Sequence, residues 1–582
     1  MAEERGIESI LVADCGTVYT KVLLLEKVES SFRFVAQAET LTTANPPWND
    51  MSVGVVHAVE DLERTTGRTI FARGRLIIPR QGIEGVDQFV VVMSAPQPLR
   101  VVLAGLIREM SLESARRAAC GTYTEIEAAL SREGSLKSPQ ESWSRTVRDL
   151  APDVVVLVGG VDGGASRPVM ELADAVALAA SMLEKEQRPI VLYAGNAALR
   201  QPIAKLMGDI TRVEVADNVH PTADTEHLGP AQTALESLYV EHRIKTAPGA
   251  ETLAGWSHRP IIPTATAFSR VVEYLWHREG NRDRGVLGID AGAATTTVAA
   301  TFDGHPYVSI YPNGIAQGPL DWLKDHSLDE ISRWLPEEMS PDELLAMLHN
   351  RALHPWTTPQ DAHELWVEQA VAREMLQAAI KTAQPSWNTR TSGATDGTLP
   401  RLDPILISGG GLVHMPRPGQ ALLTILDGVQ PTGIATVLLD VNRAAPAIGA
   451  VAGVKPVAAA SSLEAGTLVP LGTVISPIGR AHQGDVIMRI HIAYEDGGEL
   501  EVEAHYGDIE IWPLLPGQQA TLTLKPNRRF DVGLGVGRGG KVKALGGIVG
   551  LVFDGRGRPL MLPEDPDRRR RLLNGWIWDV GG

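Results

Sequence analysis

The chain contains little cysteine, no excess of basic residues and no long hydrophobic run. Cys15 and Cys120 are its two cysteines, too few for a disulfide framework or a zinc ribbon, which fits a reducing compartment. The formal net charge is −16, which argues against nucleic acid as a partner because phosphate contacts need a basic surface. No apolar stretch approaches the roughly 18 residues of a membrane span. The amino-terminal residues MAEERGIESI are charged and have no apolar signal core. We therefore expect a cytoplasmic protein that binds neither nucleic acid nor membrane.

The chain is long enough for more than one domain. Its 582 residues exceed what one hydrophobic core supports, and its 44% hydrophobic and 21% charged residues are typical of globular proteins. Buried strands rich in Val, Ile and Leu alternate with helices in the blocks 1–270 and 285–455, which indicates parallel or mixed sheets covered on both faces. Short alternating strands with glycine turns follow in 466–582, which predicts a β-rich domain.

One pattern occurs twice. In "DCGTVYTK", Asp14 ends an apolar run, glycine follows at +2, threonine at +6, and a second apolar run begins. In "DAGAATTTV", Asp290 has glycine and threonine at the same two offsets and stands between two apolar runs. Each large block thus contains one predicted β-turn-β device.

The residue types in this device suit a nucleotide. Backbone N–H groups of a tight turn can bind phosphate, glycine permits close approach, hydroxyl groups add donors, and an aspartate can hold the waters of Mg²⁺. A third element, "ISGGG" after the apolar run 403–407, would let a nucleoside lie close to bare backbone. We therefore predict two RNase H-like halves that bind ATP and Mg²⁺ between them. The predicted nucleotide-binding residues are Gly16, Thr17, Thr20, Lys21, Gly292, Thr295, Thr296, Gly409, Gly410 and Gly411.

These motifs resemble the phosphate-1, phosphate-2 and adenosine motifs of the actin/Hsp70/sugar-kinase ATPase superfamily. More narrowly, the chain resembles the MutL family associated with glutamate mutase, which is unrelated to the mismatch-repair protein of that name. The stretches that carry this resemblance are "AGLIREMSLESARRAACG", "VVVLVGGVDGG" with "PIVLYAGN", and "PILISGGGLVHMP". The resemblance implies an α/β chain with an actin-like ATPase fold, followed here by the C-terminal β-rich domain.

The resemblance and the chemistry together give a hypothesis for the catalytic residues. Asp14 would hold Mg²⁺ through water, and Lys21 would neutralise charge on the β- or γ-phosphate. Asp290 would position or deprotonate the attacking water. Asp162, in the glycine-rich loop after the apolar run 154–158, is a second candidate for ordering water.

The second turn departs from the family pattern. Ala293 and Ala294 replace glycines, and Thr297 stands where an aspartate is expected. Two added methyl groups crowd the predicted phosphate position, so ATP hydrolysis is expected to be weak.

Three functions remain as alternatives. The resemblance implies an accessory or chaperone-like factor whose partner is a subunit of an adenosylcobalamin-dependent mutase such as glutamate mutase. The second function is a structural, self-associating or filament-forming actin homologue with weak or no ATPase activity. The third is a metabolite kinase or hydantoinase-like enzyme, for which the sequence shows no substrate signature.

A basic run, Arg568–Arg571, follows the acidic "PEDPD". A solvated helix face is the simpler interpretation, and anchoring of an acidic partner is the alternative.

Overall fold

The computed structural model describes residues 6–132, 139–279, 283–387 and 398–581. The chain divides into two compact units, a larger unit of Met1–Met93 with Thr252–Gly582 and an inserted unit of Ser94–Glu251. The three blocks expected from the sequence, 1–270, 285–455 and 466–582, remain a prediction.

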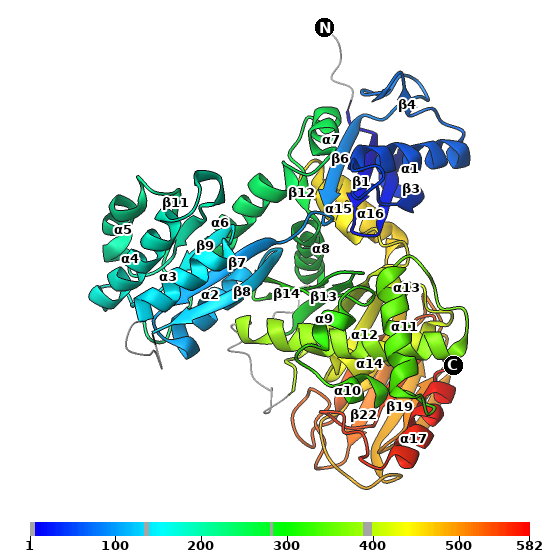
Figure 1. The fold of residues 1–582 in the computed structure, drawn as a ribbon. Helices are drawn as coiled ribbons and strands as arrows, with labels where there is room; N and C mark the ends of the chain where they lie inside the picture. The colour runs from blue at the N-terminus through cyan, green and yellow to red at the C-terminus, as the bar shows by residue number, and fades with distance from the viewer. Residues whose placement is uncertain (1–5, 133–138, 280–282, 388–397, 582) are drawn as a thin grey trace. The chain divides into compact units, whose positions relative to one another are not determined.

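The first sheet of the larger unit belongs to what we call the first half. Its strands β1 (Ser9–Cys15), β2 (Tyr19–Val28), β3 (Ser31–Leu41), β6 (Gln88–Met93) and β12 (Ile262–Pro263) lie in the order β12-β6-β1-β2-β3 (Figure 1). β1 pairs antiparallel with β2 and parallel with β6. Every residue of β1 is buried, because both faces of this sheet are covered.

The second sheet repeats this arrangement in the second half. Its first five strands are β13 (Gly285–Ala291), β14 (Thr296–Phe302), β15 (His305–Tyr311), β16 (Leu402–Ser408) and β17 (Gly433–Leu439), in the order β15-β14-β13-β16-β17. β13 is antiparallel to β14 and parallel to β16. Two RNase H-like halves with the same strand order make an actin-like ATPase fold, which confirms the predicted fold class.

Helices α8 (Thr264–Glu279) and α15 (Ala445–Ala452) lie between the two sheets (Figure 1). They cross closely at Gly449, where a Cβ atom would lie 1.8 Å from the carbonyl oxygen of Ala267. One apolar cluster unites these helices with both sheets. The outer faces are covered by α1 (Met51–Thr66), α12 (Ala362–Ala383) and α14 (Pro418–Val429).

The C-terminal residues are rich in strands, as the sequence indicates. β18 (Val469–Ser476), β24 (Gly550–Asp554) and β21 (Ile509–Trp512) continue the second sheet beyond β17. A separate four-stranded sheet has the order β20-β19-β22-β23, and helix α17 (Pro566–Asp579) ends the chain. The strands of that sheet are β19 (Val486–Tyr494), β20 (Glu499–His505), β22 (Gln519–Pro526) and β23 (Gly540–Leu545).

The inserted unit is a doubly wound α/β domain. All five strands of its sheet run parallel, in the order β11-β10-β9-β7-β8. The strands are β7 (Leu99–Gly105), β8 (Thr124–Ser131), β9 (Val154–Leu157), β10 (Ile190–Tyr193) and β11 (Val213–Val215). The helices include α2 (Glu113–Ala119), α3 (Pro139–Leu150), α4 (Arg167–Ser181), α5 (Arg200–Met207) and α6 (Gly229–Tyr239).

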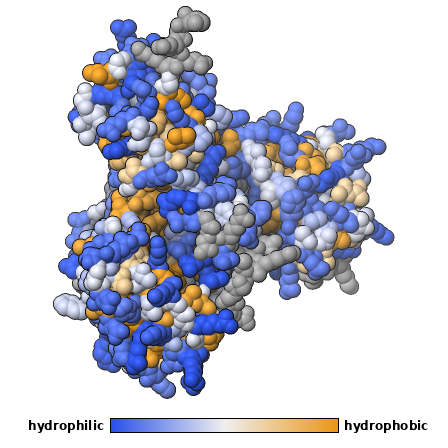
Figure 2. All heavy atoms as spheres, turned by 180° about the vertical axis from the view of Figure 1, so that it is seen from behind, coloured by the Kyte–Doolittle hydropathy of each residue, from blue (hydrophilic) through white to orange (hydrophobic). Residues whose placement is uncertain are grey.

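Hydrophilic residues cover most of the face shown in Figure 2, with separate smaller hydrophobic areas between them. None of the helices in the described ranges is both long and apolar enough to span a membrane.

Candidate nucleotide-binding site

The first predicted turn joins β1 to β2. The strand register places Asp14 opposite Lys21. The N–H of Gly16 donates to the carbonyl oxygen of Tyr19 at 2.9 Å, and a Cβ on Gly16 would lie 2.9 Å from that same oxygen. Glycine is therefore needed for the chain to close this turn.

The second predicted turn, between β13 and β14, has the same geometry. Asp290 lies opposite Thr297. The N–H of Gly292 donates to Thr295 O at 2.9 Å, and a Cβ on Gly292 would lie 2.9 Å from that oxygen. The repeated spacing in the sequence thus corresponds to a repeated backbone turn, one in each half.

The two threonines at +6 have a structural role. The hydroxyl of the fully buried Thr20 donates to Thr42 Oγ1 at 3.2 Å, just after β3. The hydroxyl of the fully buried Thr296 donates to the carbonyl oxygen of Asn313 at 3.0 Å, just after β15. Each fastens its hairpin to the segment that follows the third strand. Thr17 and Thr295 are half-buried in the turns themselves.

Asp14 and Lys21 form a buried ion pair. Lys21 Nζ lies 3.0 Å from Asp14 Oδ2, with side-chain exposures of 10% and 7%. The same ammonium donates to the carbonyl oxygen of Arg443 at 2.9 Å. Lys21 therefore links a carboxylate of the first half to the backbone of the second half.

Asp290 has an altered proton affinity. Burial raises its pKa to about 6, with Lys21 opposing that rise and the carboxylates of Asp14 and Asp440 adding to it. A buried carboxyl group prefers its neutral form because the charge loses its hydration.

Asp440, which the motif analysis missed, is the third carboxylate of this cluster. It follows β17 and accepts the N–H groups of Ala444 and Ala445, each at 2.8 Å, and the hydroxyl of Ser408 at 3.0 Å. Burial raises its pKa. One sequence signal could have found it, because Asp440 comes directly after an apolar run of the sequence, as Asp14 and Asp290 do.

A cavity of about 680 Å³ lies beside both turns in the larger unit. Val18 and Tyr19 of the first turn, and Gly292 and Ala293 of the second, contribute to its wall. Of the predicted residues, Gly292, Gly410 and Gly411 line this main cavity, whereas the other candidates, including Asp14 and Asp290, which were predicted to be catalytic, are not part of its lining.

The three glycines after β16 have different roles. Gly409 has φ 106°, and a Cβ there would lie 2.1 Å from the carbonyl oxygen of Ala291, so this glycine permits close packing against β13. A Cβ on Gly410 would enter open space, with Arg443 Nη1 nearest at 3.9 Å. A Cβ on Gly411 would lie 3.0 Å from Ile315 Cδ1. Gly410 and Gly411 thus leave room inside the main cavity.

Two arginines and their carboxylate partners also line the main cavity. Arg443 pairs with Glu39, and Arg351 Nη2 lies 3.1 Å from Glu368 Oε2. Burial raises the pKa of Glu368. These residues come from segments far apart in the sequence and belong to no motif, so sequence reasoning missed them.

A match between this sequence and the model of one protein family decides the family of the chain. The model described as "MutL protein" matches residues 10–466. The chain belongs to the MutL family. Protein MutL of Clostridium tetanomorphum is 25% identical over 306 residues, which cover 52% of this chain and 59% of that protein, so the match spans less than two thirds of the relative.

Among solved structures with detectable similarity, two align with this chain over most of their own length. The nucleotide-free structure of acetone carboxylase is 11% identical at a TM-score of 0.33, covering 85% of this chain and 81% of that one. A glycerol dehydratase reactivase is 10% identical at a TM-score of 0.30, covering 77% of this chain and 100% of that one.

In this MutL-family chain, the second turn is closed on one side by the segment that follows β15. The carbonyl oxygen of Ala293 accepts the N–H groups of Ala316 and Gln317 at 3.1 and 2.8 Å. Ala294 is half-buried and Thr297 is buried. The residues that depart from the expected pattern therefore lie in or next to the turn beside the main cavity.

Asp162 belongs to the inserted unit. Its Oδ1 accepts the N–H of Ala197 at 2.8 Å and the amide of Asn218 at 2.9 Å. The carboxylate therefore holds the glycine-rich loop of that unit.

Proposed function

We propose that this MutL-family protein binds Mg-ATP in the main cavity and acts as an accessory or chaperone-like factor for an adenosylcobalamin-dependent mutase such as glutamate mutase. The observation that carries the proposal is the meeting of two equivalent β-turns at one cavity of about 680 Å³. Small-molecule sites typically have volumes of about 300 to 1,000 Å³.

The walls of the cavity differ in chemistry along its length. Val18, Tyr19, Gly292 and Ala293 of the two turns form one part of the lining, and the N–H groups of such turns are suited to phosphate oxygens. Arg443 adds a cation whose positive charge would partly neutralise the negative charge of the triphosphate. Gly410 and Gly411 would accommodate the nucleoside.

Magnesium fits this arrangement as a largely hydrated ion. No group of three or more His, Cys, Asp or Glu side chains able to hold a metal occurs among the described residues. Mg²⁺ needs only one or two carboxylates besides water and substrate phosphates, and Asp14 with Asp290 would provide them. Asp14 would do so while it remains paired with Lys21.

Hydrolysis in this proposal depends on Asp290. With its pKa raised to about 6, the carboxyl group is mostly ionised at pH 7 and can accept a proton from an attacking water. The methyl group of Ala293, in the cavity wall, would restrict phosphate approach. We therefore propose a weak ATPase in which nucleotide binding matters more than turnover.

The partner is inferred from the family resemblance. MutL-family membership supports an accessory role beside an adenosylcobalamin-dependent mutase, and a cytoplasmic location follows from the same proposal. The C-terminal β-rich region would present the surface that contacts the mutase or a second copy of the chain.

A structural role without ATP turnover is the second candidate. The paired state of Lys21, which contacts Asp14 and the carbonyl oxygen of Arg443, favours it, because this ammonium already has partners. Sedimentation with and without Mg-ATP would reveal filaments.

Calorimetry with Mg-ATP tests the binding proposal. Gly410→Val would fill open space in the cavity, whereas Gly575→Val, on the exposed side of α17 with nothing within 4 Å of its Cβ position, is the matched control. We expect wild type and Gly575→Val to bind Mg-ATP and Gly410→Val to lose affinity by about tenfold or more. Equal affinity in all three proteins, or no binding by wild type, would contradict the proposal.

The partner proposal needs a separate measurement. Tagged protein is mixed with purified glutamate mutase subunits, with Mg-ATP or without nucleotide. Co-elution that changes with nucleotide supports the accessory role, and its absence under both conditions refutes that part while leaving the ATP result intact.

A further inference from the structure

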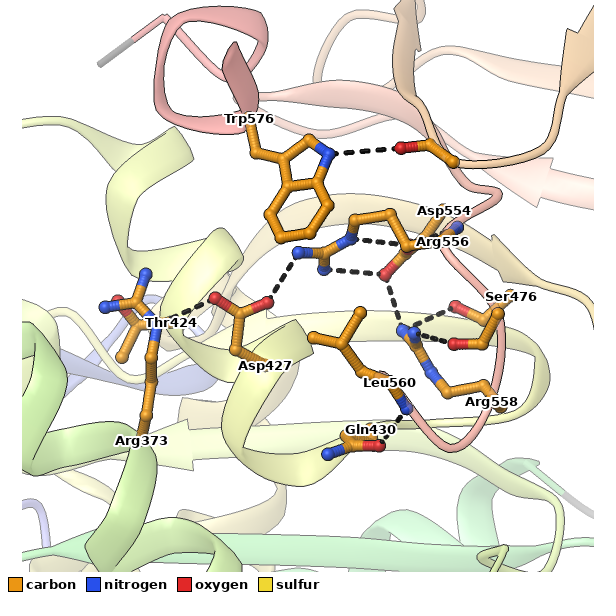
Figure 3. Close-up of polar contacts among 12 residues, drawn as sticks. Arg373, Thr424, Asp427, Gln430, Ser476, Asp554, Arg556, Arg558, Leu560 and Trp576 are labelled. Carbon is orange, nitrogen blue, oxygen red and sulfur yellow. Dashed lines mark hydrogen bonds and ion pairs between the residues drawn. The ribbon is translucent and has the colours of Figure 1, made fainter. Parts of the chain in front are cut away.

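A buried ionic network fastens the C-terminal region to helices of the second half (Figure 3). Asp427 on α14 accepts Arg373 Nε from α12 and Arg556 Nη1, each at 2.7 Å. Asp554, the last residue of β24, accepts Arg556 Nε and Nη2 at 2.9 Å and also pairs with Arg558. All five side chains are at most 3% exposed.

The charges in this network do not cancel. Three arginines face two aspartates, which leaves one positive charge in excess where water has been removed. A buried charge without a counterion is costly. The network therefore favours an anion nearby.

A second cavity, of about 490 Å³, lies against this network. We call it the arginine pocket. Arg556 and Arg558 form part of its inner wall, and no Asp or Glu occurs among its described lining residues. This is notable in a chain whose net charge is −16.

Apolar side chains form other parts of the wall, including Leu560, Met561, Leu572 and Trp576. The ring of Trp576 lies over the Arg556 guanidinium at 4.7 Å from the ring centroid, and its Nε1 donates to Gly507 O at 3.1 Å (Figure 3). These contacts fix the indole in place, so the wall combines fixed positive charge with apolar surface.

Two more arginines of the lining are exposed and available. The guanidinium groups of Arg480 and Arg568 make no ion pair or hydrogen bond with any residue in the described ranges. Arg568 begins the basic run seen in the sequence. Forked guanidinium donors match the oxygens of carboxylates and phosphates.

We propose that the arginine pocket binds a small organic anion, a carboxylate or phosphate ester with an apolar portion. Arg480 and Arg568 would hold the anionic group, the excess positive charge behind them would add attraction, and the apolar wall would cover the rest of the ligand. Its residues are separate from those of the main cavity, so this site does not depend on the ATP proposal.

Calorimetry with four probes tests this assignment: phenyl phosphate, benzoate, inorganic phosphate and chloride. The proteins are wild type, Arg480→Gln/Arg568→Gln, and the control Arg571→Gln, whose exposed arginine lies on α17 outside the lining. We expect phenyl phosphate or benzoate to bind wild type and the control alike, and the double variant to bind about tenfold more weakly. Each measurement is repeated in the Gly410→Val background, which excludes binding in the main cavity.

Met561→Ala tests the apolar part of the site. This methionine is 73% exposed, so we expect its truncation to leave the fold intact. The substitution should weaken the binding of phenyl phosphate more than the binding of inorganic phosphate. Three results would each overturn the proposal. The first is that neither organic anion binds, and the second is that the double variant binds them as tightly as wild type. The third is that inorganic phosphate or chloride binds as tightly as the organic anions.

Discussion

Asp14 and Lys21 lie opposite each other across the first hairpin, with carboxylate oxygen and ammonium nitrogen 3.0 Å apart. At the equivalent place in the second hairpin, Asp290 faces Thr297 and has no such cation. The two hairpins share a backbone and differ in charge. Burial raises the pKa of Asp290, and the charge of Lys21, which also pairs with Asp14, opposes that rise.

Replacing Lys21 by methionine should destabilise the larger unit. The change leaves Asp14 buried without its partner, which typically costs about 3 to 5 kcal/mol. Urea unfolding followed by tryptophan fluorescence measures this, since every tryptophan except Trp143 lies in the larger unit. The double variant Asp14→Asn/Lys21→Met should recover most of the loss. A change below about 1 kcal/mol in Lys21→Met would show that the pair contributes little.

The raised pKa of Asp290 predicts a pH dependence of stability. Between pH 3.8 and about 6 the folded protein holds a proton on Asp290 that the unfolded chain has released, so this residue's contribution to stability falls as pH rises through that window. The total fall is at most about 3 kcal/mol. The free energy of unfolding of wild type minus that of Asp290→Asn should therefore decrease from pH 4 to pH 6. A difference that is independent of pH would contradict the assignment.

Adjacent glycines should respond differently to the same substitution. Gly409→Ala places a Cβ 2.1 Å from a backbone carbonyl oxygen at φ 106°, and we expect a loss of about 2 kcal/mol or more. Gly410→Ala meets nothing closer than 3.9 Å and should change stability by less than about 0.5 kcal/mol. Thermal unfolding of both variants measures the contrast, and equal melting temperatures would refute it.

Neutralising Asp554 should loosen the attachment of the C-terminal region. Asp554→Asn removes the charge that pairs with Arg556 and Arg558, all at most 1% exposed, and leaves buried cations without compensation. We expect a loss of about 3 to 5 kcal/mol, with earlier proteolysis after residue 466 in limited digestion. Glu503→Gln removes an exposed partner of Arg489 and is the control, expected to change stability by less than about 1 kcal/mol.

Removing the two methyl groups of the second turn should favour nucleotide binding. Ala293→Gly/Ala294→Gly restores the glycines of the family pattern beside the main cavity. Calorimetry should show higher Mg-ATP affinity than wild type by a few-fold, about 1 kcal/mol. Unchanged or weaker binding would mean that the alanines do not restrict phosphate approach.

The sequence was sufficient for the repeated part of the fold. Apolar runs on either side of each Asp-x-Gly turn, at identical spacing, predicted both hairpins. The apolar composition of these runs also indicated that their strands belong to sheets covered on both faces. The threonines at +6 show where this reasoning was incomplete. A hydroxyl at a repeated position can bind phosphate or fasten a loop, and the buried bonds of Thr20 and Thr296 serve the second purpose.

By itself, the sequence determined the strand periodicity, the glycine turns and the duplication, because these depend on local steric and hydrophobic preferences. Only the tertiary structure decided which charges meet. Lys21 donates to the backbone carbonyl oxygen of Arg443, Asp427 pairs with Arg556, and Arg480 and Arg568 line one pocket. The two residues of each set nevertheless lie far apart in the sequence. Electrostatic interactions depend on distance and burial in space, and neither is visible in the order of residues along the chain.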